Sequence, residues 1–197
     1  MCAANDWKSS LFGIRAEAQT RRFDAMWPAM PNISFRVAQW QDKAVLSRML
    51  ELYQYDLSEV WPQMLNEHGE YGFAVDRYLR NPRLRAYFFL VDGAYAGFGL
   101  VDPDVSLPGN EFWMGQFFVM KRYRRLGVGT QAARFIFDQF RGKWEVGQMP
   151  LNLPAQAFWR RTIAEYTEGR FVEHELHDER WDGFLQCFDN SIDARAT

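Results

Sequence analysis

From residue 33 onward, the chain alternates between short apolar segments and mostly longer amphipathic ones. The short segments are rich in aromatic and β-branched residues, as strands are, and the longer ones show helical spacing or helix-boundary residues. Predicted helices cover residues 43–60, 74–79, 127–141 and 155–166. Predicted strands cover residues 33–40, 84–91, 94–102, 112–120, 143–151, 170–178 and 180–188.

Two boundaries between predicted elements have residues that are typical of a helix cap or a tight turn. Asp42 stands directly before the first helix, in which Val45 and Met49 begin a helical repeat, so its side chain is predicted to cap that helix. The dipeptide Asp92-Gly93 separates two apolar segments and suits a two-residue primed turn. These two segments are therefore predicted to form a β-hairpin.

The resulting order, β-α-α-β-β-β-α-β-α-β-β, predicts an α/β (α+β) domain with a mixed, partly antiparallel sheet and helices packed on it. We assign this domain to residues 33–190 and a short tail to residues 191–197. Residues 1–32 are predicted to be an N-terminal extension or an overlong start. A short helix is expected over residues 16–26, ended by the prolines of WPAMPN.

Composition excludes several classes of protein. The 197 residues are 48% hydrophobic, which favours a globular domain, and the net charge of -2 argues against broad binding to nucleic acid or a membrane surface. Cys2 and Cys187 lie at opposite ends, so no disulfide framework or cysteine metal cluster is expected. No apolar run has transmembrane length and no secretory signal is evident. A cytoplasmic location is the resulting expectation.

The segment KRYRRLGVGT, residues 121–130, places glycines and basic side chains where a strand gives way to a helix. The first N–H groups of a helix lack partners and lie at its positive end, so this segment could let phosphate oxygens reach the main chain. It is neither a Walker P-loop nor a dinucleotide fingerprint, because the required lysine and third glycine are missing. A solvated basic turn explains the same residues equally well.

The motif Arg124-Arg125-Leu126-Gly127-Val128-Gly129 resembles the Gln/Arg-x-x-Gly-x-Gly/Ala hallmark of the GNAT superfamily of N-acetyltransferases. The later stretch NLPAQAFW resembles the family's second signature, Asn-x-x-Ala followed by an aromatic pair. Residues 142–173 also resemble a subgroup of bacterial predicted acetyltransferases. The resemblance implies a mostly antiparallel sheet of six to seven strands, opened between the fourth and fifth, with about four flanking helices.

The same resemblance implies acetyl transfer from acetyl-CoA to a primary amine of a small molecule or peptide by direct attack. The strand before the motif would bind the pantetheine arm through its main chain, and the motif would wrap the pyrophosphate. Asn152 would contact the arm or instead cap the following helix. The cofactor-binding residues implied are Phe117, Phe118, Val119, Arg124, Arg125, Leu126, Gly127, Val128, Gly129, Thr130, Asn152 and Phe158.

Catalytic groups are less clear from the sequence. Glu145 is the first candidate base, since it shares a strand face with Gly147, which matches a position that carries a glutamate in some members; Glu111 is the second. The alternative for Glu145 is a salt-bridged or surface strand glutamate, and the alternative for Glu111 is a plain loop carboxylate. Trp159 replaces the tyrosine that serves many members as general acid. Tyrosines that could fill that role are Tyr53, Tyr55 and Tyr166.

The acceptor and the partners are open. Tyr53, Tyr55, Asp56 and Glu59 would receive a cationic amine or simply form a helix core and a solvated face. No metal is expected, because His174 and His177 would point to opposite faces of a strand. Homodimers are a reasonable expectation. The missing tyrosine also allows a different class of function, a non-catalytic acyl-CoA-binding module or sensor.

Overall fold

The computed structural model describes residues 31–191, so the predicted extension, its short helix and the last six residues lie outside the described residues. The predicted order of helices and strands is confirmed. The strands are β1 (Ile33–Val37), β2 (Arg85–Val91), β3 (Ala94–Asp102), β4 (Phe112–Val119), β5 (Lys143–Gln148), β6 (Val172–Asp178) and β7 (Trp181–Asp189). The helices are α2 (Lys43–Leu57), α3 (Asp76–Arg80), α4 (Val128–Gln139) and α5 (Leu153–Thr167), with short 3-10 turns over Trp40–Asp42 and Lys121–Tyr123.

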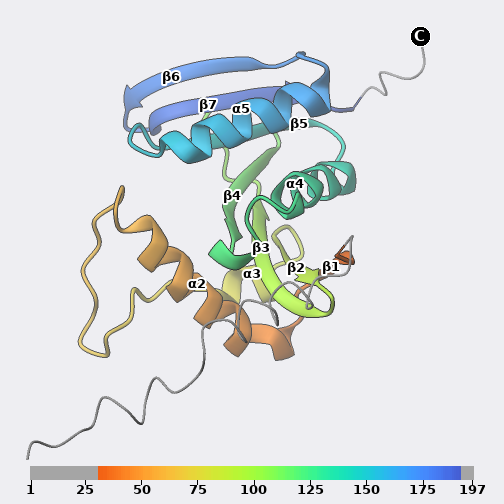
Figure 1. Cartoon of the computed structure of the whole chain (residues 1–197). Coiled ribbons are helices and arrows are strands. Elements are labelled where there is room, and N and C mark those ends of the chain that lie inside the picture. Colours follow the sequence, from red (N-terminus) through yellow and green to blue (C-terminus); the bar gives the residue numbers. More distant parts are fainter. Residues whose placement is uncertain (1–30, 192–197) are drawn as a thin grey trace, which may run out of the picture. The chain divides into compact units, whose positions relative to one another are not determined.

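The seven strands form one sheet in the order β1-β2-β3-β4-β5-β7-β6. Every neighbouring pair is antiparallel except β4 and β5, which run parallel. The expected mixed, mostly antiparallel sheet is therefore confirmed. Helix α4 lies on one side of β3 and β4 and α2 on the other, while α5 lies along β5 and β7 (Figure 1).

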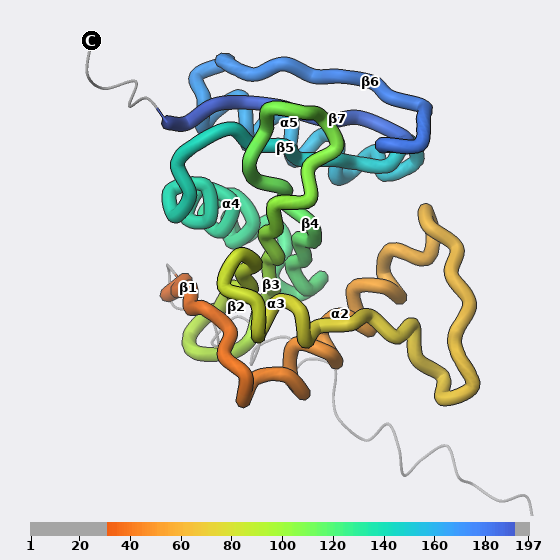
Figure 2. The backbone as a smooth tube through the Cα atoms, turned by 180° about the vertical axis from the view of Figure 1, so that it is seen from behind, coloured from red at the N-terminus to blue at the C-terminus, as the bar shows by residue number. Residues whose placement is uncertain are grey.

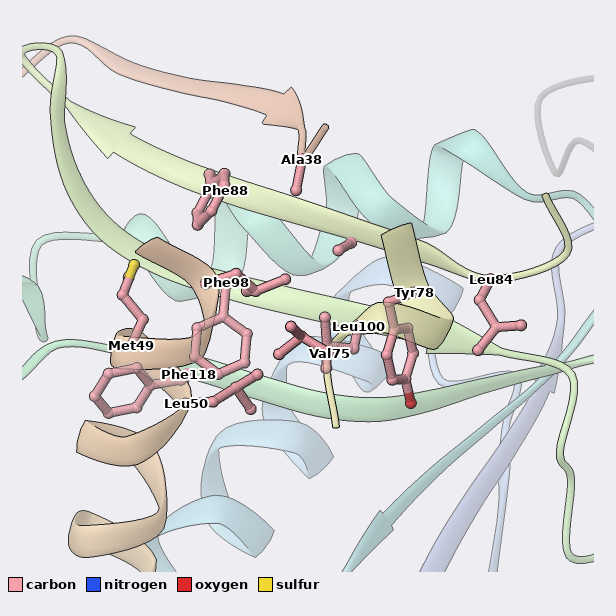
Figure 3. Packing of buried hydrophobic residues seen from close by; sticks show 12 residues of the cluster. Ala38, Met49, Leu50, Val75, Tyr78, Leu84, Phe88, Phe98, Leu100 and Phe118 are labelled. Atoms are coloured by element: carbon pink, nitrogen blue, oxygen red, sulfur yellow. The ribbon is translucent and has the colours of Figure 1, made fainter. Parts of the chain in front are cut away.

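Alternation along the strands sends successive aromatic rings to opposite faces of the sheet. On the α2 face, Phe98 and Phe118 pack against Met49, Leu50 and neighbouring apolar side chains (Figure 3). On the other face, aromatic rings of β4, α4, β5, α5 and β7 meet in a second cluster. Its members are Phe117, Phe137, Trp144, Trp159 and Phe188.

A β-bulge interrupts the pairing of β3 with β4. Leu100 pairs with Gln116 and the next residue, Val101, pairs with Met114, so Gly115 is the extra residue of β4. Bulges bend a strand and change the direction of nearby side chains, and they are common next to functional sites. This one lies where β4 begins to leave β5.

The structure corrects the expected role of Asp42. It occupies the N-cap position of α2, but its side chain makes no cap hydrogen bond. Instead its two oxygens accept hydrogen bonds from the guanidinium of Arg36 at 2.7 and 2.9 Å, and one also accepts the backbone N–H of Gln39. A charged bidentate donor outcompetes a neutral main-chain amide for this carboxylate.

Three predicted elements extend three residues too far: β1 ends at Val37 rather than residue 40, α2 at Leu57 rather than residue 60, and β5 at Gln148 rather than residue 151. Residues 58–60 form turns. Among residues 31–191, no helix is both long and apolar enough to cross a bilayer.

The Arg36–Asp42 pair should make stability depend on pH. The hydrogen bond from Arg36 holds the pKa of Asp42 below its ordinary value despite partial burial, so the pair stabilises the fold above about pH 4 and loses this contribution as pH falls. We expect Asp42→Asn to lower the free energy of unfolding by about 1–2 kcal/mol at pH 7. The difference from the natural protein should shrink as urea unfolding is repeated down to pH 3.

The matched control is Asp76→Asn. Asp76 pairs with Lys43 near the same helix, but both side chains are 46% exposed, so this change should cost less than about 0.5 kcal/mol. Equal losses for the two variants, or a loss at Asp42 that does not vary with pH, would contradict the assignment.

Candidate active site

The pairing of β4 with β5 stops after two residue pairs. Phe112 lies opposite Trp144 and Trp113 opposite Glu145, and no later residue of β4 pairs with β5. From Met114 onward the two parallel strands separate, and β4 continues toward the start of α4 (Figure 1). The expected opening between the fourth and fifth strands is thus present, and we call it the wedge.

Main-chain groups of β4 line one side of the wedge. The N–H of Met120 donates to the carbonyl of Ala96 in the β3 direction at 2.9 Å. Because main-chain groups alternate along a strand, those of Phe118 also face β3, whereas those of Phe117 and Val119 face the wedge. Of the three residues expected to lend backbone groups, the register therefore turns Phe117 and Val119 toward the opening and Phe118 away from it.

Helix α4 begins beside the wedge with a special backbone geometry. The N–H of Gln131 donates to the carbonyl of Gly127 at 3.1 Å, so the helix provides no acceptor for the N–H groups of Val128, Gly129 and Thr130. Gly127 has a φ of 81°, a left-handed value that only glycine adopts without strain. Arg125 is also left-handed, at 66°. Left-handed residues at such spacing in a turn point consecutive N–H groups toward the same side, which makes a concave binding site for an anion.

Gly129 is required for a different reason. A Cβ atom at this position would lie 3.1 and 3.2 Å from ring atoms of Phe158. Phe158 in turn stacks on Phe117, with 5.9 Å between ring centroids. The glycine therefore lets α5 close onto α4 beside the wedge, in addition to any role in anion binding.

The guanidinium group of Arg124 binds two other groups of the protein. Its Nε donates to the carbonyl of Val119 at 2.8 Å, and its guanidinium forms an ion pair with Asp56, which Lys121 also contacts at 2.9 Å. Burial alone would raise the pKa of Asp56, but these two cations hold it below its ordinary value. Arg124 thus ties α2 to the end of β4, and Asp56 is occupied by cations of the chain itself.

Asn152 caps α5, which is one of the two roles expected for it. Its side-chain oxygen accepts the N–H of Ala155 at 3.2 Å.

Arg125 and Leu126 lie on the exposed turn before α4. Tyr55 is 70% exposed, and Tyr53 packs on Phe98 and Phe118.

A hollow of about 580 Å³ lies between the segment after α2, the segment after β5 and the β6–β7 turn. Its apolar part comes from Val60, Trp61, Met149, Pro150, Leu151 and Trp181, and its polar part from Asp178, Glu179, Arg180 and Asp182. Trp181 also contacts Trp113, at the inner end of the wedge, with ring centroids 5.1 Å apart. The ring of Trp113 lies over Gly147, where a Cβ would approach it within 2.3 Å.

Comparison with known proteins gives the family. The acetyltransferase (GNAT) family model matches residues 46–163. The chain belongs to the GNAT family. Members of this family use acetyl-CoA and transfer its acetyl group. No curated protein matches the sequence significantly.

Solved structures of other GNAT proteins share the fold at low sequence identity. An acetyltransferase of this family from Staphylococcus aureus Mu50 superimposes with a TM-score of 0.57 and 15% identity over 80% of this chain and 99% of its own. An acetyltransferase from Thermus thermophilus gives 0.54 and 17%, over 80% and 95%. An aminoglycoside acetyltransferase, AAC(6')-Ib, solved in complex with coenzyme A, gives 0.56 and 14%, over 84% and 99%.

Within this GNAT fold, the two candidate bases have very different surroundings. Glu145 is fully buried, and its oxygens accept hydrogen bonds from the backbone N–H groups of Ser106 and Leu107 and the side chain of Asn110 at 2.7–2.8 Å. All three donors belong to the loop 103–111, which lies across β5 and β7 (Figure 2). Glu145 therefore anchors this loop to the sheet.

Glu111 lies at the closed end of the β4–β5 pair. Its carboxylate accepts the N–H of Lys143 at 3.0 Å. The whole length of β4 separates it from Val119, which corresponds to about 25 Å along the strand. The geometry keeps Glu111 away from the open end of the wedge.

The GNAT tyrosine position is part of the aromatic core. Trp159 is only 5% exposed and packs edge-on against Phe117 with centroids 4.9 Å apart. Tyr166 lies near the far end of α5, where its hydroxyl donates to Asp138 at 2.8 Å. No sequence pattern pointed to Trp113, Trp181 or the hollow, because these depend on how the β6–β7 turn meets the segment after β5.

If Glu145 holds the 103–111 loop in place, removing its side chain should lower the stability of the fold, and not only the rate of turnover. Glu145→Ala leaves three donors without their acceptor, and we expect it to lower the free energy of unfolding by about 3 kcal/mol or more. Amide exchange at Ser106 and Leu107 should also accelerate. Glu111→Ala, which removes one exposed acceptor, is the control and should cost about 1 kcal/mol. Unchanged stability in Glu145→Ala, with turnover lost, would instead favour the base role.

Proposed function

We propose that this protein transfers an acetyl group from acetyl-CoA to a primary amine by direct attack. The observation that carries the proposal is the open edge of β4, where the main-chain groups of Phe117 and the N–H of Val119 face the wedge, while the carbonyl of Val119 is taken by Arg124. Such an edge can pair with the amides of the pantetheine arm as an added strand would.

The start of α4 is the proposed pyrophosphate site. Three helix N–H groups without helical partners, a positive helix end and the left-handed turn at Arg125 and Gly127 together favour a doubly charged anion. Because Asn152 caps α5 through its oxygen, its NH₂ group can donate to the arm. The cofactor set is then Phe117, Val119, Arg125, Leu126, Gly127, Val128, Gly129, Thr130, Asn152 and Phe158, with Phe118 and Arg124 holding β4 and the loop in place.

The hollow beside the wedge is the proposed acceptor pocket. Its apolar walls suit an amine carried on a hydrophobic or aromatic group. Among its charged lining residues, Arg180 pairs with Asp178 and Asp182 pairs with His177, which leaves Glu179 as the carboxylate that favours a cation. In the reaction, the acceptor ammonium first gives one proton to a base or water. The neutral amine then attacks the thioester carbonyl carbon, the N–C bond forms, the C–S bond breaks, and the remaining extra proton of the nitrogen passes through solvent to the departed thiolate. The N–H of Val119 is the proposed donor to the developing oxyanion.

The thiolate is proposed to leave without a positioned acid. Trp159 offers only an indole N–H, which is no practical proton donor, and Tyr166 is remote. A thiol is acidic enough to depart as its anion at neutral pH with little help.

The second candidate function is a non-catalytic acyl-CoA-binding module, favoured by Trp159 and by the saturated hydrogen bonding of Glu145. Thiol release from acetyl-CoA, measured with tryptamine, phenethylamine, spermidine and a peptide, separates the two. Release that depends on an amine supports the enzyme. Tight binding without release from any of them supports the module.

The proposed phosphate site is tested by Gly127→Glu. The carboxylate repels phosphate and the side chain strains a φ of 81°, so we expect coenzyme A affinity in calorimetry to fall at least ~100-fold. Gly93→Glu is a matched control, because Gly93 has a φ of 79° with nothing within 4 Å of its Cβ and lies in the β2–β3 turn. It should share the backbone strain but keep the affinity.

Both variants should show similar losses in melting temperature, since the strain is alike. A folded Gly127→Glu protein that keeps the natural affinity would refute the proposed site.

A further inference from the structure

The groups at the start of α4 account for the pyrophosphate of coenzyme A but not for its third phosphate. That phosphate is attached to the 3′ oxygen of the adenosine, one ribose ring away from the pyrophosphate. It carries close to two negative charges at neutral pH. A protein that holds such a group is expected to use an arginine whose charge is not already balanced by a carboxylate.

Most basic side chains near the start of α4 are already paired with carboxylates. Lys121 and Arg124 share Asp56. Arg134, in the second turn of α4, forms an ion pair with Glu165 of α5 at 3.0 Å. A guanidinium in such a pair has part of its charge compensated and some of its N–H donors occupied, so it is poorly suited to hold a further phosphate.

Arg161 of α5 differs from these residues. Its side chain is exposed, and within residues 31–191 no hydrogen bond, ion pair or ring contact engages it. Glu165 lies one turn further along α5 and could pair with it as an i, i+4 neighbour, but Glu165 binds Arg134 instead. The adjacent Arg160 donates twice to Glu173, at 2.8 Å. Arg161 therefore keeps its N–H donors and an uncompensated charge.

The packing of α5 beside α4 brings Arg161 close to the proposed pyrophosphate site (Figure 1). The ring of Phe158 lies against Gly129 in the first turn of α4, where a Cβ would be 3.1 Å from it. Arg161 follows Phe158 by three residues, so their Cβ atoms are about 5–6 Å apart on one side of α5. Glu165 lies four residues further on and contacts Arg134. Arg161 is thus placed between the two contacts that join α5 to α4.

Arg161 also lies on the outward side of these contacts. Trp159 turns into the aromatic core and is 5% exposed, whereas Arg161 and Ala157, one turn earlier on the same side, are exposed. Because the pantetheine arm is proposed to fill the wedge, the adenosine has to leave the pyrophosphate toward solvent. Ala157 presents only a methyl group there, and the long side chain of Arg161 comes next along the helix.

We propose that Arg161 binds the 3′-phosphate of coenzyme A, so that the protein selects coenzyme A over 3′-dephospho-coenzyme A. This inference rests on the proposed function, because the pyrophosphate site at the start of α4 sets where the adenosine begins. The planar guanidinium can donate two parallel hydrogen bonds to two oxygens of one phosphate. Arg161 is a binding residue and does not touch the reacting atoms. Its loss should therefore raise KM for acetyl-CoA and leave kcat unchanged.

Calorimetry with coenzyme A and 3′-dephospho-coenzyme A tests this assignment. We expect the natural protein to bind coenzyme A about tenfold more tightly, which is the effect of one charge-assisted contact at an exposed site. Arg161→Ala should lower the affinity for coenzyme A about tenfold and keep that for the dephospho form within about twofold. The selectivity of the natural protein should shrink as salt is raised, since the contact is exposed.

Two variants serve as comparisons. Arg170→Ala removes an exposed arginine just after α5 that pairs with Glu168, and it should match the natural protein with both ligands. Arg125→Ala removes a charge beside the pyrophosphate site on the turn before α4. Because both ligands contain the pyrophosphate, this change should weaken their binding by the same factor and preserve the selectivity.

A natural protein that binds the two ligands equally well overturns the inference. So does an Arg161→Ala protein that loses affinity for both ligands by the same factor, or selectivity that disappears in Arg125→Ala instead. Arg161 is exposed, so Arg161→Ala should keep the natural melting temperature. A natural protein that binds neither ligand overturns the proposed function itself, which is a separate outcome from these.

Discussion

The separation of β4 from β5 is the constraint on which the rest of the structure depends. A strand inside a sheet normally satisfies its N–H and C=O groups on both sides, and an unmet group costs free energy once water is excluded. Here β4 pairs with β3 along most of its length but meets β5 at only two positions. The open edge is therefore a binding surface for a partner with amide groups, and the neighbouring elements are arranged around it.

Three contacts hold the surroundings of that edge. Arg124 links the carbonyl of Val119 to Asp56 on α2, so the outer end of β4 is fixed to a helix far away in sequence. Glu145 fixes the 103–111 loop at the inner end. Gly129 lets Phe158 bring α5 against α4. Each fixes one boundary of the wedge. Glu145 was a candidate base, and Arg124 and Gly129 were candidate cofactor-binding residues.

The sequence predicted the order of helices and strands because these depend on local patterns. Alternation, helical spacing and the Asp92-Gly93 turn are contained within short segments, and the glycine motif marks the start of α4. Side-chain partners depend instead on the register of the sheet. Arg124 meets Asp56 across 68 residues, and Glu145 meets Leu107 across 38. No local sequence pattern indicates either contact. In the same way, Asp42 binds Arg36 rather than its own helix.

Amide hydrogen exchange at β4 tests the central claim most directly. If the pantetheine arm pairs with the open edge, saturating coenzyme A should slow exchange at Phe117, whose N–H faces the wedge. Phe118, whose main chain faces β3, should be slow already and change little. Bound coenzyme A that leaves the exchange rate of Phe117 unchanged would contradict the account.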